Sequence, residues 1–480
     1  MSIRYDGLRK LLHLDFLNVR FMQKRYRYKK KWATQLRKKE ATELALEHFD
    51  QFYSPVYGKL WPSIRISLLC SQKYCALVNN FHASPDAVME ELQSRGAYNF
   101  LTGTNSFKHV YRSCQNVNEN EGTSSQRKEN NLLMENSNIQ DVASTDLAKE
   151  SREENTSYSP ENTEDCDAGR TPAEPTTRLN QDLYSSFIPA QKVYSDRQLL
   201  KDQEVSQSIY EPLNIEVPVI EDSMIKIPKH LKVFVHPFGD VSDFPAPKRD
   251  QCGMLEYYLM DAASVLPVIA LAPGPADSIL DMCAAPGGKT LTMLQTLTTG
   301  NILANDISRS RLQRLGSILE YYCPNACTHV KKSQISGQKF DSPMFDKVLV
   351  DVPCSTDRHV LTSEENNLFK PGRINDRLQI TNKQKELLLA GIKSCKPGGT
   401  VVYSTCSLAP TQNDGIIQAV FEDLWNTTKI DIAVENISWM SKAFSNTFRF
   451  FDNCRFGQLV LPTLRANFGP MYLCKIKRIN

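Results

Sequence analysis

From about residue 226 to the end of the chain, short apolar runs alternate with longer amphipathic stretches, and this alternation constrains the fold most strongly. The apolar runs predict strands at 278–282, 301–305, 345–352, 400–404 and 471–475. The stretches between them predict helices at 290–298, 309–322, 379–394 and 413–425. Strands that alternate with helices are typical of an α/β fold with a doubly wound, mostly parallel sheet.

The first 39 residues are strongly basic, although the whole chain of 480 residues has a net charge of only +3. They hold 13 Lys and Arg against 2 acidic residues, a net charge of +11. A basic, acid-poor and partly amphipathic start predicts that residues 1–39 are an organelle transit segment. A basic arm that touches RNA is the alternative, because Tyr alternates with cations in the stretch KRYRYKKK at 24–31.

The rest of the chain divides into three parts by composition. Residues 40–112 have a net charge of −1 and apolar residues at helical spacing, which predicts an N-terminal helical region. Residues 113–216 hold 9 basic and 20 acidic residues among many Asn, Ser and Thr. Such a segment cannot bury enough apolar surface to offset the entropy lost on ordering, so we predict a mostly disordered acidic insertion. Residues 217–480, with a net charge of +4, carry the alternating pattern and form the predicted main domain.

Several classes of protein and site are excluded or disfavoured. No run of about 18 apolar residues is present, so we expect no membrane-spanning helix. The 13 cysteines have no secretory context and are expected to be reduced thiols. Cys323 and Cys327 have three residues between them, but no second pair of ligands follows, and we predict no metal site.

A small-residue loop follows the first predicted strand in the sequence ILDMCAAPGGKT at 279–290. Gly287 and Gly288 allow the backbone to approach a ligand, and the next helix points its N-terminal N–H groups at that place. The spacing is not that of a phosphate-binding loop, and a tight strand-to-helix turn is the alternative. Asp306 follows the second strand, where a carboxylate can accept hydrogen bonds from both ribose hydroxyls of a nucleoside. A helix N-cap is the alternative for Asp306.

Two cysteines follow two further predicted strands. Cys354 stands in VDVPC behind Asp351, and Cys406 stands in YSTCS. In open α/β sheets, ligands bind beyond the carboxyl ends of the strands. A lone cysteine at such an edge is more often inert than catalytic, but two beside an aspartate and a nucleoside loop predict nucleophilic chemistry.

Three motifs in order, LDMCAAPGGKT, LVDVPCSTDRH and VVYSTCSL, resemble the signature set of the Nop/Sun RNA cytosine-5-methyltransferases, which use S-adenosylmethionine. The resemblance covers about residues 226–480. It implies a class I S-adenosylmethionine-dependent methyltransferase fold, with 217–480 as the catalytic domain. Further segments at 60–81, 255–264, 357–369 and 464–475 resemble the mitochondrial member that methylates small-subunit ribosomal RNA. That member acts with a termination-factor-like partner, so the resemblance implies a mitochondrial matrix protein with a role in ribosome assembly.

The resemblance also implies roles for individual residues. Cys406 is the nucleophile that adds to carbon 6 of cytosine, and Cys354 acts as base on the carbon-5 proton or assists elimination. Asp351 binds the ring edge of cytosine and lies near the cofactor. The implied S-adenosylmethionine contacts are Cys283, Ala284, Ala285, Pro286, Gly287, Gly288, Lys289, Asp306, Ser336 and Asp351. Relatives usually have aspartate where this chain has Ser336, so we expect cofactor binding weaker by roughly 1 kcal/mol.

The RNA substrate is expected to be unpaired, because a base must leave its stack to reach a buried nucleophile. A phosphate-binding surface is expected among basic residues of the main domain: Lys331, Lys332, Arg358, Lys370, Arg373 and Arg377. A net charge of +4 binds RNA modestly, which favours a partner protein. The alternatives are a ribosome-assembly scaffold with secondary catalysis, or a methyltransferase that acts on transfer RNA or DNA.

Overall fold

The computed structural model describes residues 39–102, 217–221, 227–323 and 326–480. All of these belong to one compact unit. The predicted transit segment at 1–39, apart from its last residue, and the predicted insertion at 113–216 lie outside the described residues, so both stay predictions. Among the helices that the structure describes, none combines the length and the apolar character needed to cross a bilayer.

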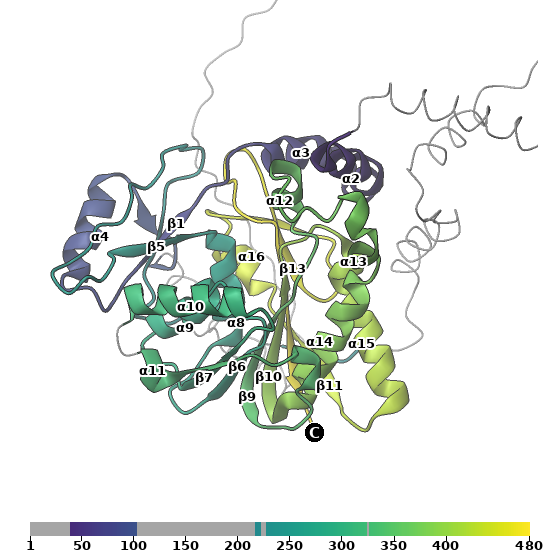
Figure 1. The fold of residues 1–480 in the computed structure, drawn as a ribbon. Helices are drawn as coiled ribbons and strands as arrows, with labels where there is room; N and C mark the ends of the chain where they lie inside the picture. The colour runs from purple at the N-terminus through teal and green to yellow at the C-terminus, as the bar shows by residue number, and fades with distance from the viewer. Residues whose placement is uncertain (1–38, 103–216, 222–226, 324–325) are drawn as a thin grey trace, which may run out of the picture. The chain divides into compact units, whose positions relative to one another are not determined.

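A ten-stranded sheet forms the centre, with the strand order β12-β13-β14-β10-β9-β6-β7-β8 and with β11 and β3 paired beside β14 (Figure 1). The strands from β10 to β8 run parallel, whereas β14, β13 and β12 continue the sheet antiparallel. The prediction of a doubly wound, mostly parallel α/β sheet is confirmed. The bounds are β3 (Val219–Glu221), β6 (Ser278–Asp281), β7 (Asn301–Asn305), β8 (Val330–Ser333), β9 (Phe345–Asp351), β10 (Cys395–Thr405), β11 (Ile432–Asn436), β12 (Arg449–Phe451), β13 (Gln458–Leu461) and β14 (Met471–Arg478).

The five strands and four helices predicted from the alternating pattern are all present. The strand at 301–305 and the helix at 309–322 coincide with their predictions, whereas β10 begins five residues before the predicted start at 400. The helices of this part are α8 (Leu266–Leu271), α9 (Gly288–Gln295), α10 (Arg309–Tyr322), α11 (Ala326–His329), α12 (Asp357–Thr362), α13 (Ile374–Leu378), α14 (Ile380–Ser394), α15 (Asp414–Thr427) and α16 (Trp439–Ala443). Short 3₁₀ turns are η3 (Ala262–Val265), η4 (Gly337–Lys339), η5 (Pro371–Arg373) and η6 (Pro410–Gln412).

Both faces of the parallel strands are covered, because successive side chains of a strand point to opposite faces. In β9, Val348 and Val350 belong to the apolar cluster that contains α14 and α15, whereas Leu349 between them belongs to the cluster that contains α8, α9 and α10. In β10, Val401 and Val402 divide in the same way. The strands therefore read as continuous apolar runs, as expected for a sheet buried on both sides.

The N-terminal helices α2 (Ala41–Tyr57) and α3 (Trp61–Leu69), which η1 (Gly58–Leu60) joins, pack on the main domain. Ala45, Phe49, Tyr53 and Tyr57 of α2 recur every four residues and are all buried. They form one stripe that enters the same apolar cluster as α14 and α15. Figure 1 shows α2 and α3 beside α12, the short helix that follows β9.

The prediction that residues 40–112 are helical is wrong for two segments. After α3 the chain enters β1 (Cys75–Val78), and after α4 (Pro85–Ser94) it enters β2 (Tyr98–Asn99). These pair antiparallel with β4 (Val233–Val235) and β5 (Tyr257–Met260) in a second sheet of order β2-β4-β1-β5. A buried run of four apolar residues has no periodicity that separates strand from helix, and the partner strands lie more than 130 residues away.

Candidate active site

The carboxyl ends of β6, β7, β9 and β10 bring the predicted motifs to one edge of the sheet. Asp351 at the end of β9 pairs in register with Ser404 of β10. Cys354 follows Asp351 by three residues and Cys406 follows Ser404 by two, so the parallel register carries both cysteines to the same place. The predicted proximity of Asp351, Cys354 and Cys406 is a direct consequence of this pairing.

The small-residue loop turns between β6 and α9 and lies against β7. The Ala284 N–H donates to the carbonyl of Asn305 over 2.8 Å. Gly287 has a φ of +117°, which disfavours any side chain, and an added Cβ would lie 3.3 Å from Leu315 of α10. Gly288 begins α9, so the free N–H groups of this eight-residue helix face the strand ends. The loop therefore has the geometry of a ligand-binding turn.

Asp306 is buried beside this loop, and one of its carboxylate oxygens accepts no hydrogen bond from the described residues. Its Oδ1 accepts from the Ser308 N–H over 2.8 Å, whereas Oδ2 has no hydrogen-bond partner in the described part of the chain. The Arg311 guanidinium lies 3.5 Å from Oδ2. The helix N-cap is Ser308, so the N-cap alternative for Asp306 is wrong. An oxygen with these surroundings suits a ribose hydroxyl.

Asp281 at the end of β6 was not singled out from the sequence. It is fully buried, accepts from the Thr290 hydroxyl over 2.7 Å, and leaves Oδ1 without a partner among the described residues. Burial raises the pKa of Asp281 to about 7, although the Thr290 hydrogen bond opposes the shift. The sequence signal was an acidic residue directly after an apolar strand, next to the glycine loop.

Asp351 is fixed from two sides. The Lys289 ammonium donates to its Oδ2 over 2.8 Å, and the Ser404 hydroxyl donates to its Oδ1 over 2.7 Å. Lys289 is only 12% exposed, and burial alone would lower its pKa, but the Asp351 carboxylate outweighs burial and the pKa of Lys289 is raised. The result is a protonated lysine beside a carboxylate that is 29% exposed at the edge of the sheet.

The sulfur atoms of Cys354 and Cys406 are 2.8 Å apart. The backbone N–H of Cys406 also donates to the Cys354 sulfur over 3.3 Å. The hydrogen bond with Cys354 and burial raise the pKa of Cys406 well above its ordinary value, whereas Lys289 lowers it. In this arrangement Cys406 is a thiol, and a proton must leave it before it can act as a nucleophile.

Two predicted cofactor residues lie at the margin of this group. Burial raises the pKa of the Cys283 thiol, and the negative charges of Asp351 and Asp281 raise it further. Cys283 is therefore an inert thiol. The Ser336 hydroxyl donates to the Gln338 side chain over 3.0 Å. The backbone N–H of its neighbour Ile335 donates a hydrogen bond to the Asn305 side chain at the end of β7. The structure therefore places Ser336 beside the strand that carries Asp306, and its role stays a prediction.

A buried carboxylate beneath the cysteines was also missed. Asp357 of α12 is fully buried and accepts from the Tyr53 hydroxyl and the Leu408 N–H, each over 2.7 Å. It accepts from Ser355 and, over 3.3 Å, from Ser407. Burial raises the pKa of Asp357, and the donated hydrogen bonds oppose this shift.

This carboxylate joins the two cysteine loops to each other. Ser355 follows Cys354 and Ser407 follows Cys406, and the two serine hydroxyls are 2.8 Å apart. The repeated Cys-Ser pair after two strands was the available sequence signal. Because Tyr53 belongs to α2, the same carboxylate also ties the N-terminal region to the site.

A sequence model of the family described as 16S rRNA methyltransferase RsmB/F matches residues 268–458. The 5-cytosine rRNA methyltransferase NSUN4 of Mus musculus is 37% identical over 479 residues, which cover 98% of each chain. The mitochondrial tRNA (cytosine(34)-C(5))-methyltransferase of Mus musculus is 36% identical over 266 residues, 54% of this chain and 74% of that protein. A solved methyltransferase homologue of Pyrococcus horikoshii is 18% identical, with a TM-score of 0.46, and covers 91% of this chain and 98% of its own.

Replacement of Tyr53 by Phe is expected to lower the free energy of unfolding by about 1–3 kcal/mol, because a buried carboxylate loses a donor. Chemical denaturation measures this loss. Tyr257→Phe is the control, since it removes a hydroxyl that donates to the uncharged carbonyl of Pro245, and it should cost about 1 kcal/mol or less. A smaller loss for Tyr53→Phe than for the control would show that Asp357 does not depend on this donor.

Asp281→Asn is expected to change how stability depends on pH. Because the pKa of Asp281 is raised to about 7 in the folded protein, the unfolded chain releases this proton near pH 4 while the folded chain keeps it. Asp281 therefore stabilises the fold least above about pH 7, and the loss develops between about pH 4 and 7. The free-energy difference between wild type and Asp281→Asn should shift against wild type across that window. A difference that stays constant with pH would contradict the shift, and Asp341→Asn, an exposed position, is the control.

Proposed function

The chain belongs to the RsmB/F, or Nop/Sun, family of RNA cytosine-5-methyltransferases that use S-adenosylmethionine, and we propose that its substrate is a cytosine in mitochondrial small-subunit ribosomal RNA. The rRNA methyltransferase of Mus musculus aligns over 98% of the chain, including the N-terminal region. The transfer RNA methyltransferase aligns over 54%. Similarity over the whole length therefore supports a ribosomal substrate over transfer RNA.

The observation that carries the proposed chemistry is the contact between Cys354 and Cys406, 2.8 Å apart, beside Asp351. Carbon 5 of cytosine is a weak nucleophile. Addition of the Cys406 thiolate to carbon 6 breaks the 5,6 double bond and makes carbon 5 able to attack a methyl group. Asp351 holds the ring edge, and Lys289 fixes the Asp351 carboxylate for that task. Removal of the carbon-5 proton then lets the Cys406 sulfur leave and restores the double bond.

Proton transfer between the two sulfurs activates the nucleophile in this proposal. Cys354 already accepts from the Cys406 N–H over 3.3 Å, so its sulfur is oriented as an acceptor toward Cys406. The hydrogen bond with Cys354 and burial raise the pKa of Cys406, and the positive charge of Lys289 opposes that rise. After Cys354 has passed the Cys406 proton on to solvent, it is near enough to serve as base on the carbon-5 proton or to assist elimination.

The residues at the strand ends fit S-adenosylmethionine, which supplies an electrophilic methyl group when bound. Asp306 and Asp281 each have a buried carboxylate oxygen without a hydrogen-bond partner among the described residues. Both flank the loop from Cys283 to Lys289. We assign the ribose hydroxyls to Asp306 and the adenine side to Ser336, and we place the loop backbone against the rest of the cofactor.

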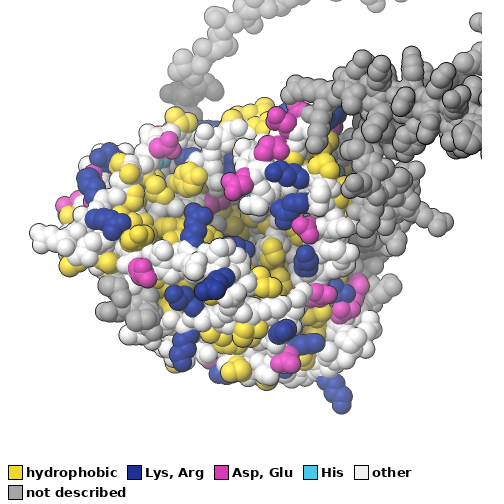
Figure 2. Space-filling view, in the orientation of Figure 1, with side chains coloured by type: hydrophobic (Ala, Val, Ile, Leu, Met, Phe, Trp, Pro, Cys, Tyr) yellow, Lys and Arg dark blue, Asp and Glu magenta, His cyan; other side chains and the backbone are white. Residues whose placement is uncertain are grey.

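A partner protein is part of the proposal. On the face that Figure 2 shows, Lys and Arg side chains are interspersed with Asp and Glu and do not gather into one basic patch. Without residues 1–39 the chain would have a net charge near −8, because that segment alone contributes +11. An enzyme of this charge holds RNA poorly by electrostatic attraction. A termination-factor-like partner that binds the ribosomal RNA would supply the missing affinity.

The basic segment 1–39 would direct the protein to the mitochondrial matrix, where the ribosomal substrate is found. A role in assembly of the small ribosomal subunit accompanies this location. The alternative is a scaffold whose presence, and not its catalysis, is what assembly requires. The paired cysteines favour the enzyme, because a scaffold has no need of two thiols in contact at a strand edge.

Two cysteine variants test the chemistry. Cys406→Ala should abolish methyl transfer to RNA and form no covalent complex, because no sulfur adds to carbon 6. Cys354→Ala should methylate slowly and accumulate a protein–RNA adduct that survives denaturing electrophoresis. Cys252→Ala, which removes an exposed cysteine, should behave as wild type. An adduct formed by Cys406→Ala would refute the assignment of the nucleophile.

Bisulfite sequencing of mitochondrial RNA from cells that lack the protein tests the substrate. One cytosine of the small-subunit ribosomal RNA should lose its methyl group, with mitochondrial transfer RNA unchanged. Re-expression of wild type should restore the methyl group, and re-expression of Cys406→Ala should not. Full rescue of ribosome assembly by Cys406→Ala would favour the scaffold, and loss of methylation in transfer RNA alone would overturn the ribosomal substrate.

A further inference from the structure

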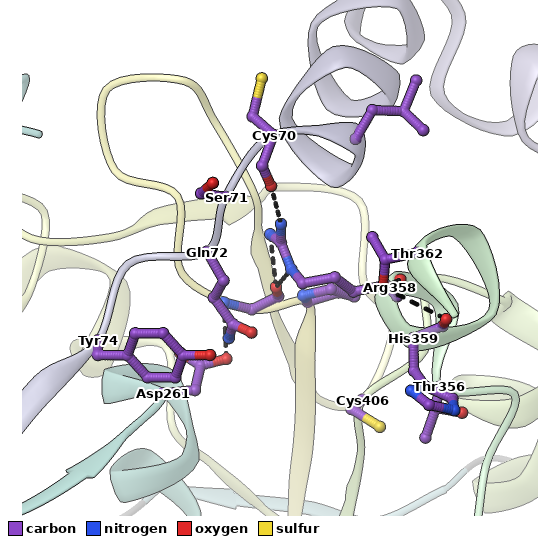
Figure 3. A pocket seen from close by; sticks show the side chains of 13 residues that line it. Cys70, Ser71, Gln72, Tyr74, Asp261, Thr356, Arg358, His359, Thr362 and Cys406 are labelled. Carbon is purple, nitrogen blue, oxygen red and sulfur yellow. Dashed lines mark hydrogen bonds between the residues drawn. The ribbon is translucent and has the colours of Figure 1, made fainter. Parts of the chain in front are cut away.

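A cavity of about 480 Å³ opens above Cys406 and is walled partly by the N-terminal region (Figure 3). Gln72 and Tyr74 contribute one wall, and Arg358 and His359 of α12 contribute another. Figure 3 shows Tyr74 and His359 on opposite sides, with Cys406 between them. Sites for ligands of nucleotide size and above measure about 300–1,000 Å³, so the cavity has room beyond the reacting base.

Arg358 is not available to bind phosphate, contrary to the expectation from the sequence. Its guanidinium donates to the backbone carbonyls of Ser67, Cys70 and Gly469 and to the Asn467 side chain, at 2.8–3.2 Å. These bonds use all five of its N–H groups. Arg358 therefore fixes the walls of the cavity and leaves recognition to other side chains.

The acidic residue that lines the cavity, Asp261, is likewise hydrogen-bonded within the protein. Asp261 accepts from the backbone N–H groups of Ala263 and Gly469, each over 2.9 Å. Since Asp261 is satisfied by backbone N–H groups and Arg358 by backbone carbonyls and the Asn467 side chain, the cavity offers little charge to a ligand. Stacking and neutral hydrogen bonds are the interactions that it can supply.

The extended segment before β1 presents two uncommitted side chains to the cavity. Lys73 is held on the far side, where its N–H donates to Asn467 over 3.0 Å and its ammonium donates to the Pro237 carbonyl over 3.1 Å. Alternation along an extended chain then directs Gln72 and Tyr74 to the opposite side. Both line the cavity, and within the part of the chain that the structure describes neither side chain has a hydrogen-bond partner.

Tyr74 has the properties of a stacking platform. Tyr74 is 48% exposed, and it lines the same cavity as the half-buried Cys406. An aromatic ring in this position can stack on a nucleic-acid base of any identity. Extrusion of the target base leaves its neighbour without a stacking partner, so a ring at the cavity wall compensates for that loss.

We propose that Tyr74 stacks on the RNA base next to the target cytosine and that the Gln72 amide bonds to the same nucleotide. This inference rests on the proposed RNA methylation and adds to it a second nucleotide site built by the N-terminal region. It assigns Gln72 and Tyr74 to substrate binding, whereas α2 and α3 position the catalytic loops.

The test measures kcat/KM of the full chain on a single-stranded RNA oligonucleotide with one cytosine that wild type methylates. Tyr74→Ala should lower kcat/KM by about 10-fold or more, mainly through KM for RNA. Tyr74→Phe keeps the ring and should stay near wild type. Phe81→Ala removes an aromatic residue of similar exposure that does not line the cavity, and it should also stay near wild type. The affinity for S-adenosylmethionine should be the same in all four proteins.

Oligonucleotides with an abasic site on either side of the cytosine separate stacking from other effects. One of the two abasic RNAs should be a poor substrate for wild type, and Tyr74→Ala should no longer distinguish it from the intact RNA. Equal kcat/KM for Tyr74→Ala and wild type would overturn the inference, as would an equal loss in Tyr74→Phe or additive effects of the two changes. Failure of the proposed function itself would appear differently, as no methylation by wild type.

Discussion

The geometry of the site depends on a single buried carboxylate. Asp357 is fully enclosed, so its charge is tolerated only while hydrogen-bond donors surround it. The donors come from the loop after β9, the loop after β10 and helix α2. Each loop carries one of the two cysteines, and the serine that follows each cysteine donates a hydrogen bond to this carboxylate. Hence the separation of Cys354 and Cys406 is fixed by the hydrogen bonds that Asp357 accepts from both loops.

This arrangement explains why the N-terminal region is packed so closely on the catalytic half. Tyr53 reaches the carboxylate from α2, and the Tyr57 hydroxyl donates to the Leu408 carbonyl over 2.5 Å. Arg358, the next residue after Asp357, holds the segment that follows α3. Two adjacent residues of α12, Asp357 and Arg358, therefore connect the N-terminal region to the cysteine loops and to the wall of the cavity.

The sequence was informative where neighbours in space are dictated by local pattern. Apolar runs between helices predicted parallel strands, and parallel strands align their carboxyl ends, so Asp351, Cys354 and Cys406 were expected together. It was uninformative where the partner lies far along the chain. β1 looked like part of a helix because the strands β4 and β5 that pair with it lie beyond residue 230. Arg358 looked like a surface cation because the four acceptors of its five hydrogen bonds are carbonyl and amide oxygens, which leave no trace in a charge pattern.

The span of these contacts has a consequence for how the protein acquires its native state. Tyr53 and Asp357 are separated by 304 residues, and Asn467 contacts Ser67 across 400. Contacts over such distances close slowly, because the chain entropy is lost before the contact is gained. Helices α2 and α3 emerge first during synthesis but find their binding surface only when almost the whole chain is present. The two sulfurs of Cys354 and Cys406 thus reach their final separation only at the end of folding, when the N-terminal helices have docked.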